Sequence, residues 1–290
     1  MPSLKEIRIR IASVQSTEKI TSAMKLVSAA KLRRAQNAIF TLRPYANKLN
    51  AILQNISFNA SEAYPLFAQR EPENILLIVI TSNRGLCGAF NSNIIKETNR
   101  LITEKYTKQL QAGKVKLICF GKKAAEQLQK NYEISYANES LIDVPNFEEI
   151  ANLVSHLIND FMLKKADKIE IIYNRFVNPA TQKTAVENFL PIINMKQEER
   201  KKEDLNFIFQ PSQKELVEEM MPKILKTQLY KAILDSIAAE HGARMTSMAK
   251  ATDNAAEILR ELKLKYNNAR QAVITNELNE IESGAEALNN

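Results

Sequence analysis

The sequence predicts an α/β protein in which a mixed-sheet α/β domain is inserted between two long helices that form an antiparallel coiled coil. Two observations carry this prediction. Periodic helical stretches fill residues 1–56 and 213–290, and the first keeps the three- and four-residue spacing of a coiled-coil seam. Residues 74–192 alternate short apolar runs with helical segments, as α/β domains do. Residues 57–73 and 193–212 are predicted to be linkers.

The N-terminal helix begins with a capping box, because Ser3 is a suitable N-cap and Glu6 follows three residues later. Its seam runs from Leu4 to Ile56, and Pro44 need not end the helix. The seam is apolar at both ends and polar from Glu18 to Ser28. Polar seam positions either set the register of the coiled coil or face a molecule other than the partner helix, and both interpretations stay open.

Composition favours one ordinary core with extended elements. The chain has 290 residues, 45% of them hydrophobic and 25% charged, and only six glycines. Its first fifty residues carry ten Lys and Arg against Glu6 and Glu18, so this segment is expected to face an acidic partner. Cys87 and Cys119 are far apart in apolar surroundings and are predicted to be reduced thiols. No signal peptide is expected at the N-terminus.

The middle of the chain predicts a compact α/β domain. The run from Ile75 to Thr81 is continuously apolar, as in a strand buried on both faces. Further strands are predicted at 115–120, 168–173 and 184–192, and helices at 91–106, 121–130 and 147–163. A loop is expected over 59–74, a charged linker over 195–206, and an edge strand over 207–209.

A loop from Asn83 to Gly88 follows the first strand, in the position where phosphate-binding loops occur. It lacks both the G-x-G-x-x-G pattern and a Walker lysine, so a tight turn is the favoured interpretation. His156 is expected to pack within a helix, and His241 beside Glu240 has no second ligand at metal spacing. We therefore predict no catalytic residue, cofactor site or metal site, and no enzyme activity of the chain alone.

The C-terminal helix is predicted from Gln213 to Leu288, with Pro222 near its start. It is too rich in charge to hold the ~20 apolar residues of a membrane span. A helix of this length needs a partner. Antiparallel pairing with the first helix predicts that opposed residues have numbers that sum to about 269, with Met24 near Met245. The last twenty or so residues then continue unpaired, for ~30 Å.

This unpaired end has unusual chemistry. It is apolar on more than one face through Ala272, Val273, Ile274, Leu278, Ile281, Ala285 and Leu288. After Arg270 it carries four glutamates, Glu277, Glu280, Glu282 and Glu286, and no basic residue, which opposes the helix dipole. It is expected to be stable only inside a sleeve made by other chains. Small residues are dense from Ser236 to Ala256, which predicts a thin, smooth shaft.

Five stretches, taken together, resemble the gamma subunit family of the F-type ATP synthase. They are IRIRIASVQSTEKITSAMKLVSAAKLRRAQ (7–36), TSNRGLCGAFN (81–91), IIYNRF (171–176), ARMTSMAKATDNA (243–255) and NARQAVITNELNEIESGAEAL (268–288). They occur in the order found in the family. The resemblance implies a rotor shaft that couples proton-driven (or sodium-driven) rotation of a membrane ring to conformational change and ATP synthesis in a catalytic head.

The resemblance also implies the partners and the location. The partners would be three alpha and three beta subunits, the epsilon subunit and the membrane c-ring, with no nucleic acid and no cofactor. Catalysis would reside on the beta subunits, and the chain would be peripheral on the cytoplasmic side of a bacterial cell (inner) membrane. Asn83 stands where the family commonly has Asp, and Ala89 and Phe90 replace a smaller pair. The regulatory cysteine insertion of plastid relatives is absent, so no thiol switch is expected.

Six residues match family positions at which the shaft meets the head. They are Met24, Arg244, Gln271, Thr275, Glu277 and Glu280. By this resemblance Met24 and Arg244 lie at the level of a beta-subunit lever, and the other four are polar contacts of the upper helix. Ordinary seam packing is the alternative for Met24, and a solvated face is the alternative for the two glutamates.

Three other functions are compatible with parts of the sequence. A non-rotary coiled-coil scaffold would have apolar heptads throughout, which the polar seam contradicts. A nucleic-acid-binding arm would place aromatic residues among the basic ones, and only Phe40 and Tyr45 qualify. A nucleotide-binding enzyme would bind nucleotide through the isolated α/β domain, which we do not expect.

Overall fold

The computed structural model describes residues 3–60, 65–68, 70–192 and 213–289. By their internal contacts these residues form two units. One unit consists of residues 1–28 and 245–290, and the other of residues 29–244. The predicted charged linker and the predicted edge strand at 207–209 lie outside the described residues.

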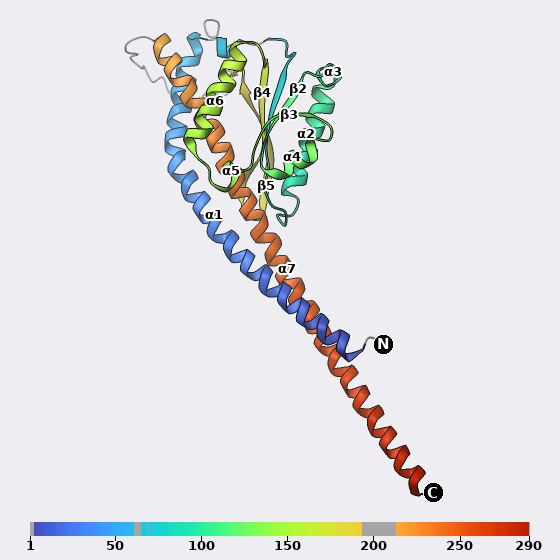
Figure 1. Ribbon diagram of the computed structural model, residues 1–290. Helices are drawn as coiled ribbons and strands as arrows, with labels where there is room; N and C mark the ends of the chain where they lie inside the picture. The colour runs from blue at the N-terminus through green and yellow to red at the C-terminus, as the bar shows by residue number, and fades with distance from the viewer. Residues whose placement is uncertain (1–2, 61–64, 69, 193–212, 290) are drawn as a thin grey trace. The chain divides into compact units, whose positions relative to one another are not determined.

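Two long helices belong to both units (Figure 1). Helix α1 spans Leu4–Ala60 and helix α7 spans Gln213–Asn289, and Pro44 and Pro222 lie inside them. The capping box is confirmed, because the Glu6 amide donates to Ser3 Oγ at 3.3 Å and the Ser3 amide donates to the Glu6 carboxylate at 3.0 Å. Helix α1 runs four residues beyond the predicted Ile56, since no proline or glycine follows before Pro65.

The unit of residues 29–244 contains a five-stranded mixed sheet in the order β3-β2-β1-β4-β5. The strands are β1 (Ile75–Ile80), β2 (Val115–Phe120), β3 (Glu133–Asn138), β4 (Lys168–Asn178) and β5 (Thr181–Leu190). Strand β1 pairs in parallel with β2 and β4, β2 pairs in parallel with β3, and only β5 is antiparallel. The predicted mixed-sheet α/β domain is therefore confirmed.

Short helices connect the strands. They are η1 (Pro65–Phe67), α2 (Phe90–Lys105), α3 (Thr107–Gln111), α4 (Lys122–Leu128), α5 (Ser140–Asp143) and α6 (Phe147–Met162). Helices α2, α4 and α6 lie within two residues of their predicted bounds. The predicted loop at 59–74 is wrong in part, because it includes the end of α1 and the short helix η1.

Three strands differ from the prediction. Strand β3 was not predicted, because it is an exposed edge strand with little apolar character. Strand β4 continues five residues beyond the predicted end, and β5 begins at Thr181 rather than Thr184. The cause is a tight hairpin, in which the Asn178 side chain accepts hydrogen bonds from the amides of Ala180 and Thr181 at 3.0 and 2.7 Å.

The core of this unit is built around β1. All six residues of β1 are buried, which confirms the strand predicted to be buried on both faces. Side chains from β2, α2 and α4 pack against it, together with Ala239 and Ala243 of α7. Cys87 and Cys119 are free thiols, and both are buried. Helix α7 thus contributes small side chains to the core of the α/β domain.

In the other unit, residues 3–28 of α1 lie antiparallel to α7, whose C-terminal end continues past the N-terminus of α1 (Figure 1). Thr252 Oγ1 donates to Thr21 Oγ1 at 2.9 Å. The predicted pairing placed Thr21 opposite Met248 instead, so that prediction is wrong by four residues, about one helical turn. It assumed that α1 ends at Ile56, whereas α1 is four residues longer.

Candidate functional site

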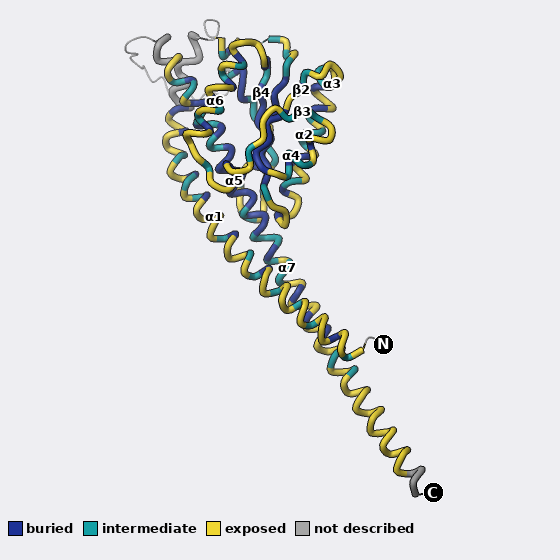
Figure 2. Tube along the Cα trace, in the orientation of Figure 1, coloured by how far each residue is buried: buried dark blue, intermediate teal, exposed yellow. Residues whose placement is uncertain are grey.

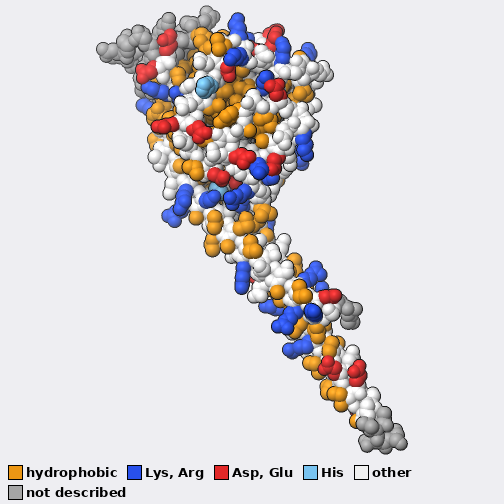
Figure 3. Space-filling view, in the orientation of Figure 1, with side chains coloured by type: hydrophobic (Ala, Val, Ile, Leu, Met, Phe, Trp, Pro, Cys, Tyr) orange, Lys and Arg blue, Asp and Glu red, His pale blue; other side chains and the backbone are white. Residues whose placement is uncertain are grey.

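The C-terminal end of α7 has no covering helix within its unit. Every residue from Arg270 to Ala285 is exposed, as the yellow end of the tube in Figure 2 shows. The apolar residues Val273, Ile274, Leu278 and Ile281 are 40%, 46%, 60% and 68% exposed. Figure 3 shows such hydrophobic side chains beside acidic ones on this part of the helix. The predicted unpaired apolar end is therefore confirmed over residues 270–285, and the side chains of Glu286 and Leu288 lie outside the described part of the chain.

Four of the predicted contact residues, Gln271, Thr275, Glu277 and Glu280, lie on this exposed end. Thr275 Oγ1 donates to the Gln271 carbonyl at 2.9 Å, so these two residues share one side of the helix. At ~100° per residue the two glutamates project from roughly the opposite side. Ile274, Leu278 and Ile281 lie between these two sides. The end of α7 thus presents chemically different faces around its axis.

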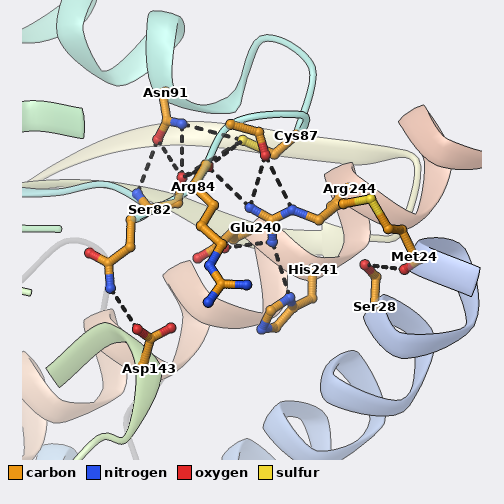
Figure 4. A network of polar contacts seen from close by, with 12 residues as sticks. Met24, Ser28, Ser82, Arg84, Cys87, Asn91, Asp143, Glu240, His241 and Arg244 are labelled. Carbon is orange, nitrogen blue, oxygen red and sulfur yellow. Dashed lines mark hydrogen bonds and ion pairs between the residues drawn. The ribbon is translucent and has the colours of Figure 1, made fainter. Parts of the chain in front are cut away.

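Met24 lies on α1 in the same unit and is half-buried. Its carbonyl accepts a hydrogen bond from Ser28 Oγ at 2.8 Å, drawn in Figure 4. Ile9, Ile20 and Val27 are 57–62% exposed on one face of the same helix. The N-terminal part of α1 therefore offers an apolar face as well as its basic side chains.

Arg244 belongs to the other unit, and it is only 7% exposed. Its Nη1 donates to Glu240 Oε1 at 2.6 Å, one turn earlier on α7. Its Nε and Nη2 donate to the Gly85 carbonyl at 3.3 Å, and Nη2 donates to the Arg84 carbonyl at 3.1 Å (Figure 4). The guanidinium therefore joins α7 to the loop that follows β1.

Glu240 is buried with Arg244, and the two side chains are each 8% exposed. Burial raises the pKa of the Glu240 carboxyl, and Arg244 opposes that rise. Burial and the positive charges of Arg244 and Lys31 lower the pKa of His241 to about 4, so this imidazole is neutral at pH 7. Within the described residues, no group of three or more His, Cys, Asp or Glu side chains could hold a metal ion.

The loop from Ser82 to Gly88 is held by its own side chains. The Ser82 amide donates to Asn91 Oδ1 at 3.0 Å, and Ser82 Oγ donates to the Arg84 carbonyl at 2.6 Å. Leu86 has a left-handed backbone, with φ 62°, and is 63% exposed. The loop offers two carbonyl oxygens to a cation rather than N–H groups to an anion. This polarity is opposite to that of a phosphate-binding loop, and the predicted tight turn is confirmed.

Asn83 ties this loop to two other segments. Its Nδ2 donates to Asp143 Oδ2 at 2.9 Å and to the Glu139 carbonyl at 2.8 Å. Its Oδ1 accepts from the Lys122 amide at 3.0 Å, at the start of α4. The loops that follow β1, β2 and β3 therefore meet at this one side chain.

A family model described as ATP synthase matches residues 3–288. The ATP synthase gamma chains of Cytophaga hutchinsonii and Flavobacterium johnsoniae are 50% and 52% identical to this chain over the full length of each protein. This chain belongs to the ATP synthase gamma-chain family. The resemblance found in the sequence is thus confirmed.

Solved structures of the family share the fold. The rotor of the Euglena gracilis mitochondrial ATP synthase, in rotational state 1, superposes with a TM-score of 0.63 at 21% identity, over 93% of this chain and 98% of that one. A second Euglena gracilis structure, with the head and c-ring in rotational state 3, gives a TM-score of 0.66 at 22% identity, over 98% and 94%. Both likenesses agree with the long helices and central sheet described above.

The predicted contact residues fall into two groups. Five of them lie in the unit of residues 1–28 and 245–290, whereas Arg244 lies in the unit of residues 29–244. Sequence reasoning missed the partner of Arg244. The Glu240–Arg244 spacing of four residues was a usable signal, because opposite charges at that spacing face one another on a helix. No sequence pattern indicated that the carbonyls of Arg84 and Gly85 would accept hydrogen bonds from Arg244.

None of the described helices is both long enough and apolar enough to cross a bilayer.

Proposed function

We propose that this chain is the rotor shaft of an F-type ATP synthase and couples ion-driven rotation of a membrane ring to ATP synthesis in a catalytic head. The observation that carries the proposal is the exposed end of α7. Leu278 and Ile281 are more than half exposed there, on a helix that nothing within its unit covers. A helix end with apolar side chains on several faces calls for a close-fitting surrounding surface.

Membership of the family supports a proposal for the partners. Relatives carry the name ATP synthase gamma chain, and solved neighbours include the head and c-ring of that complex. We propose that the end of α7 is enclosed by three alpha and three beta subunits, and that ATP is made on the beta subunits. The unit of residues 29–244 would bind the epsilon subunit and the c-ring. The chain would then be peripheral on the cytoplasmic side of a bacterial inner membrane and would need no cofactor of its own.

The different faces of α7 supply a basis for coupling. Gln271 and Thr275 lie on one side, Glu277 and Glu280 on roughly the other, and apolar residues lie between them. A surrounding subunit meets a different face at each orientation of the shaft. Each orientation therefore favours a different subunit conformation, which is the differential binding that conformational coupling requires.

Residues of α1 are proposed to take part in the same exchange. Met24 is half-buried, and Ile20 and Val27 beside it are exposed. The ten basic residues of the first fifty suit an acidic surface on the head. The resemblance predicts that Arg244 is a contact residue. Its guanidinium instead donates hydrogen bonds to groups within this chain. Its burial favours a positioning role.

Reconstitution tests this proposal. This chain is mixed with alpha and beta subunits from the same source, and complex stoichiometry and ATP hydrolysis are measured. We expect one copy of this chain per three beta subunits and turnover that depends on it. A monodisperse homodimer that ignores those subunits would instead establish the non-rotary scaffold.

A matched pair of variants tests the role of the apolar end. Leu278→Asp adds a charge and removes an apolar side chain, whereas Ser283→Asp adds the same charge at another exposed position. Loss of one buried Leu weakens assembly by ~1.5–3 kcal/mol, about ten- to hundredfold in affinity. We expect Leu278→Asp to weaken assembly by this amount and Ser283→Asp to stay closer to the unmodified chain. Equal losses in both variants would contradict an apolar sleeve.

A further inference from the structure

At residues 238–243, helix α7 packs on the α/β domain through a face of small residues, whereas larger side chains, among them Leu229, Ile233 and Leu234, are buried earlier along the helix. Ala238 and Ala239 are 0% exposed, Ala243 is 7% exposed, and Ala239 and Ala243 belong to the core of the domain. Side chains this small make shallow ridges, which allow close approach but interlock little with the opposite surface. Such a face holds the helix near the sheet but offers little resistance to rotation of the helix about its own axis.

Two contacts on the same turn of α7 do interlock. The first is steric. Gly242 lies so close to the β4–β5 hairpin that a Cβ atom there would meet Pro179 Cα at 3.2 Å and the Phe176 ring at 3.4 Å. An added Cβ atom at Gly242 would therefore force the hairpin to shift by a few tenths of an ångström.

The second contact is polar and directional. The planar guanidinium of Arg244 is held by Glu240 on one side and by the carbonyls of Arg84 and Gly85 on the other. Because its donors point in set directions, rotation of α7 would break several charge-assisted hydrogen bonds at once. The two side chains of the pair are each only 8% exposed, so little water can reach these bonds to replace them.

We propose that the Glu240–Arg244 pair, its carbonyl acceptors and the Pro179–Gly242 seat form a lock that stops α7 from turning relative to the α/β domain. This proposal rests on the proposed rotor function. In a rotor, torque applied to the α/β domain must enter α7, and at residues 238–243 the shallow alanine face by itself gives little resistance to rotation. Helix α7 continues without a break to Asn289, so it carries onward whatever torque it receives. Arg244 acts here as a positioning residue.

The main test measures slip under load in the complete complex reconstituted into lipid vesicles. ATP-driven ion uptake is followed with pH- and sodium-sensitive dyes, and the number of ions moved per ATP hydrolysed is determined as the opposing gradient builds up. The variants are Arg244→Lys, which keeps the charge but not the forked donors, and Gly242→Ala, which fills the seat. The control is Lys223→Gln, which breaks an exposed ion pair of the same spacing on the same helix.

We expect the ratio of ions to ATP to fall in Arg244→Lys and Gly242→Ala as the gradient grows, and to follow the unmodified complex in Lys223→Gln. A variant that merely assembles poorly would lose hydrolysis and uptake together and keep their ratio. A ratio that stays that of the unmodified complex at every gradient would overturn the lock. If the unmodified complex itself shows no coupled uptake, the rotor function fails, and not the lock alone.

A second measurement needs no partner subunits. Cys87 lies within the clamped loop and is 1% exposed, and Cys119 is 0% exposed in the sheet. In the full chain we expect Arg244→Gln to speed the reaction of Cys87 with a thiol reagent by about tenfold, which corresponds to ~1.4 kcal/mol of easier local opening. The labelling rate of Cys119 in the same molecule is the control, because it would also rise if the whole domain unfolded more readily. Unchanged labelling of Cys87 in a folded variant would show that Arg244 does not hold the loop.

Discussion

At the scale of single residues, Arg244 and Asn83 show how one side chain joins distant segments. Arg244 reaches carbonyls about 160 positions earlier in the chain, and Asn83 joins the loops after three parallel strands. The side-chain amide of Asn83 donates to the Asp143 carboxylate. An Asp there would oppose a like charge, so the amide fits this particular neighbourhood.

His241 gives the first prediction at this scale. Its pKa is about 4 in the folded chain, below the ordinary 6.5, because of burial and the charges of Arg244 and Lys31, opposed in part by Asp143. The unfolded chain takes up a proton first as the pH falls, so folding loses stability between about pH 6.5 and 4. The loss attributable to His241 is ~2 kcal/mol at pH 5. Urea denaturation at pH 8 and pH 5 measures it.

The control for this prediction is His241→Asn, which removes the titrating group. Glu240 beside it has a raised pKa and contributes with the opposite sign, since a raised carboxyl pKa favours the folded chain as the pH falls. The contribution of His241 is therefore the difference between the variant and the unmodified chain in how the free energy of unfolding changes with pH. The same dependence on pH in both proteins would refute the prediction.

At the scale of elements, the seam between α1 and α7 contains buried polar residues. Thr21 and Ser28 are 9% and 3% exposed, and Thr21 meets Thr252 across the helix pair. Thr252 is half-buried, and a polar pair in a seam costs stability compared with apolar packing but specifies one register. Register matters here, because the predicted helix ends alone gave a pairing one turn away from the observed one. The structure thus supports the register interpretation for Thr21.

A double-mutant cycle tests this seam contact. Thr21→Val or Thr252→Val alone leaves one hydroxyl facing a methyl group, and we expect each to cost ~1 kcal/mol of unfolding free energy. The double variant replaces both hydroxyls and should recover most of that loss. The control is Thr17→Val, an exposed threonine on the same helix whose hydroxyl bonds to the Ser13 carbonyl. Denaturation followed by circular dichroism of the helices gives the unfolding free energy of each variant. Additive losses in the double variant would show that the two threonines do not interact.

At the scale of the whole molecule, the chain combines a well-packed α/β domain with a helix end that lacks a partner. Strand β1 is buried throughout, while residues 270–285 are exposed throughout. A helix end that carries glutamates and no basic residue after Arg270 also opposes its own dipole. Strand β1 is held by packing on both faces, whereas the apolar end of α7 has no such packing within the described residues of its unit.

Hydrogen exchange tests this contrast. In the free chain, amides of residues 270–285 should exchange within the fastest class, while those of β1 should be among the slowest. On assembly with alpha and beta subunits, residues 270–285 should become protected and β1 should change little. Protection of the α7 end in the free chain would contradict an unpaired end and would indicate self-association.

The sequence predicted elements well wherever the pattern was local. The apolar run of β1 and the periodicity of α1 and α7 identified their elements, because burial and helix formation follow from neighbouring residues. Strand β3 was missed because its residues are mostly exposed, and no pattern within its own residues predicts its pairing with β2. The candidate contacts Gln271, Glu277 and Glu280 came from the resemblance, and the structure adds that they are exposed.

The sequence by itself determined the family, the two long helices, the inserted sheet and the unpaired apolar end, because each of these depends on patterns along the chain. Only the tertiary structure decided the pairing register and the surroundings of Arg244. Helical spacing shows that Glu240 and Arg244 face each other, but not that both are buried or that Arg84 and Gly85 lie beside them. Contacts between distant segments depend on how those segments pack, and no local pattern records that packing.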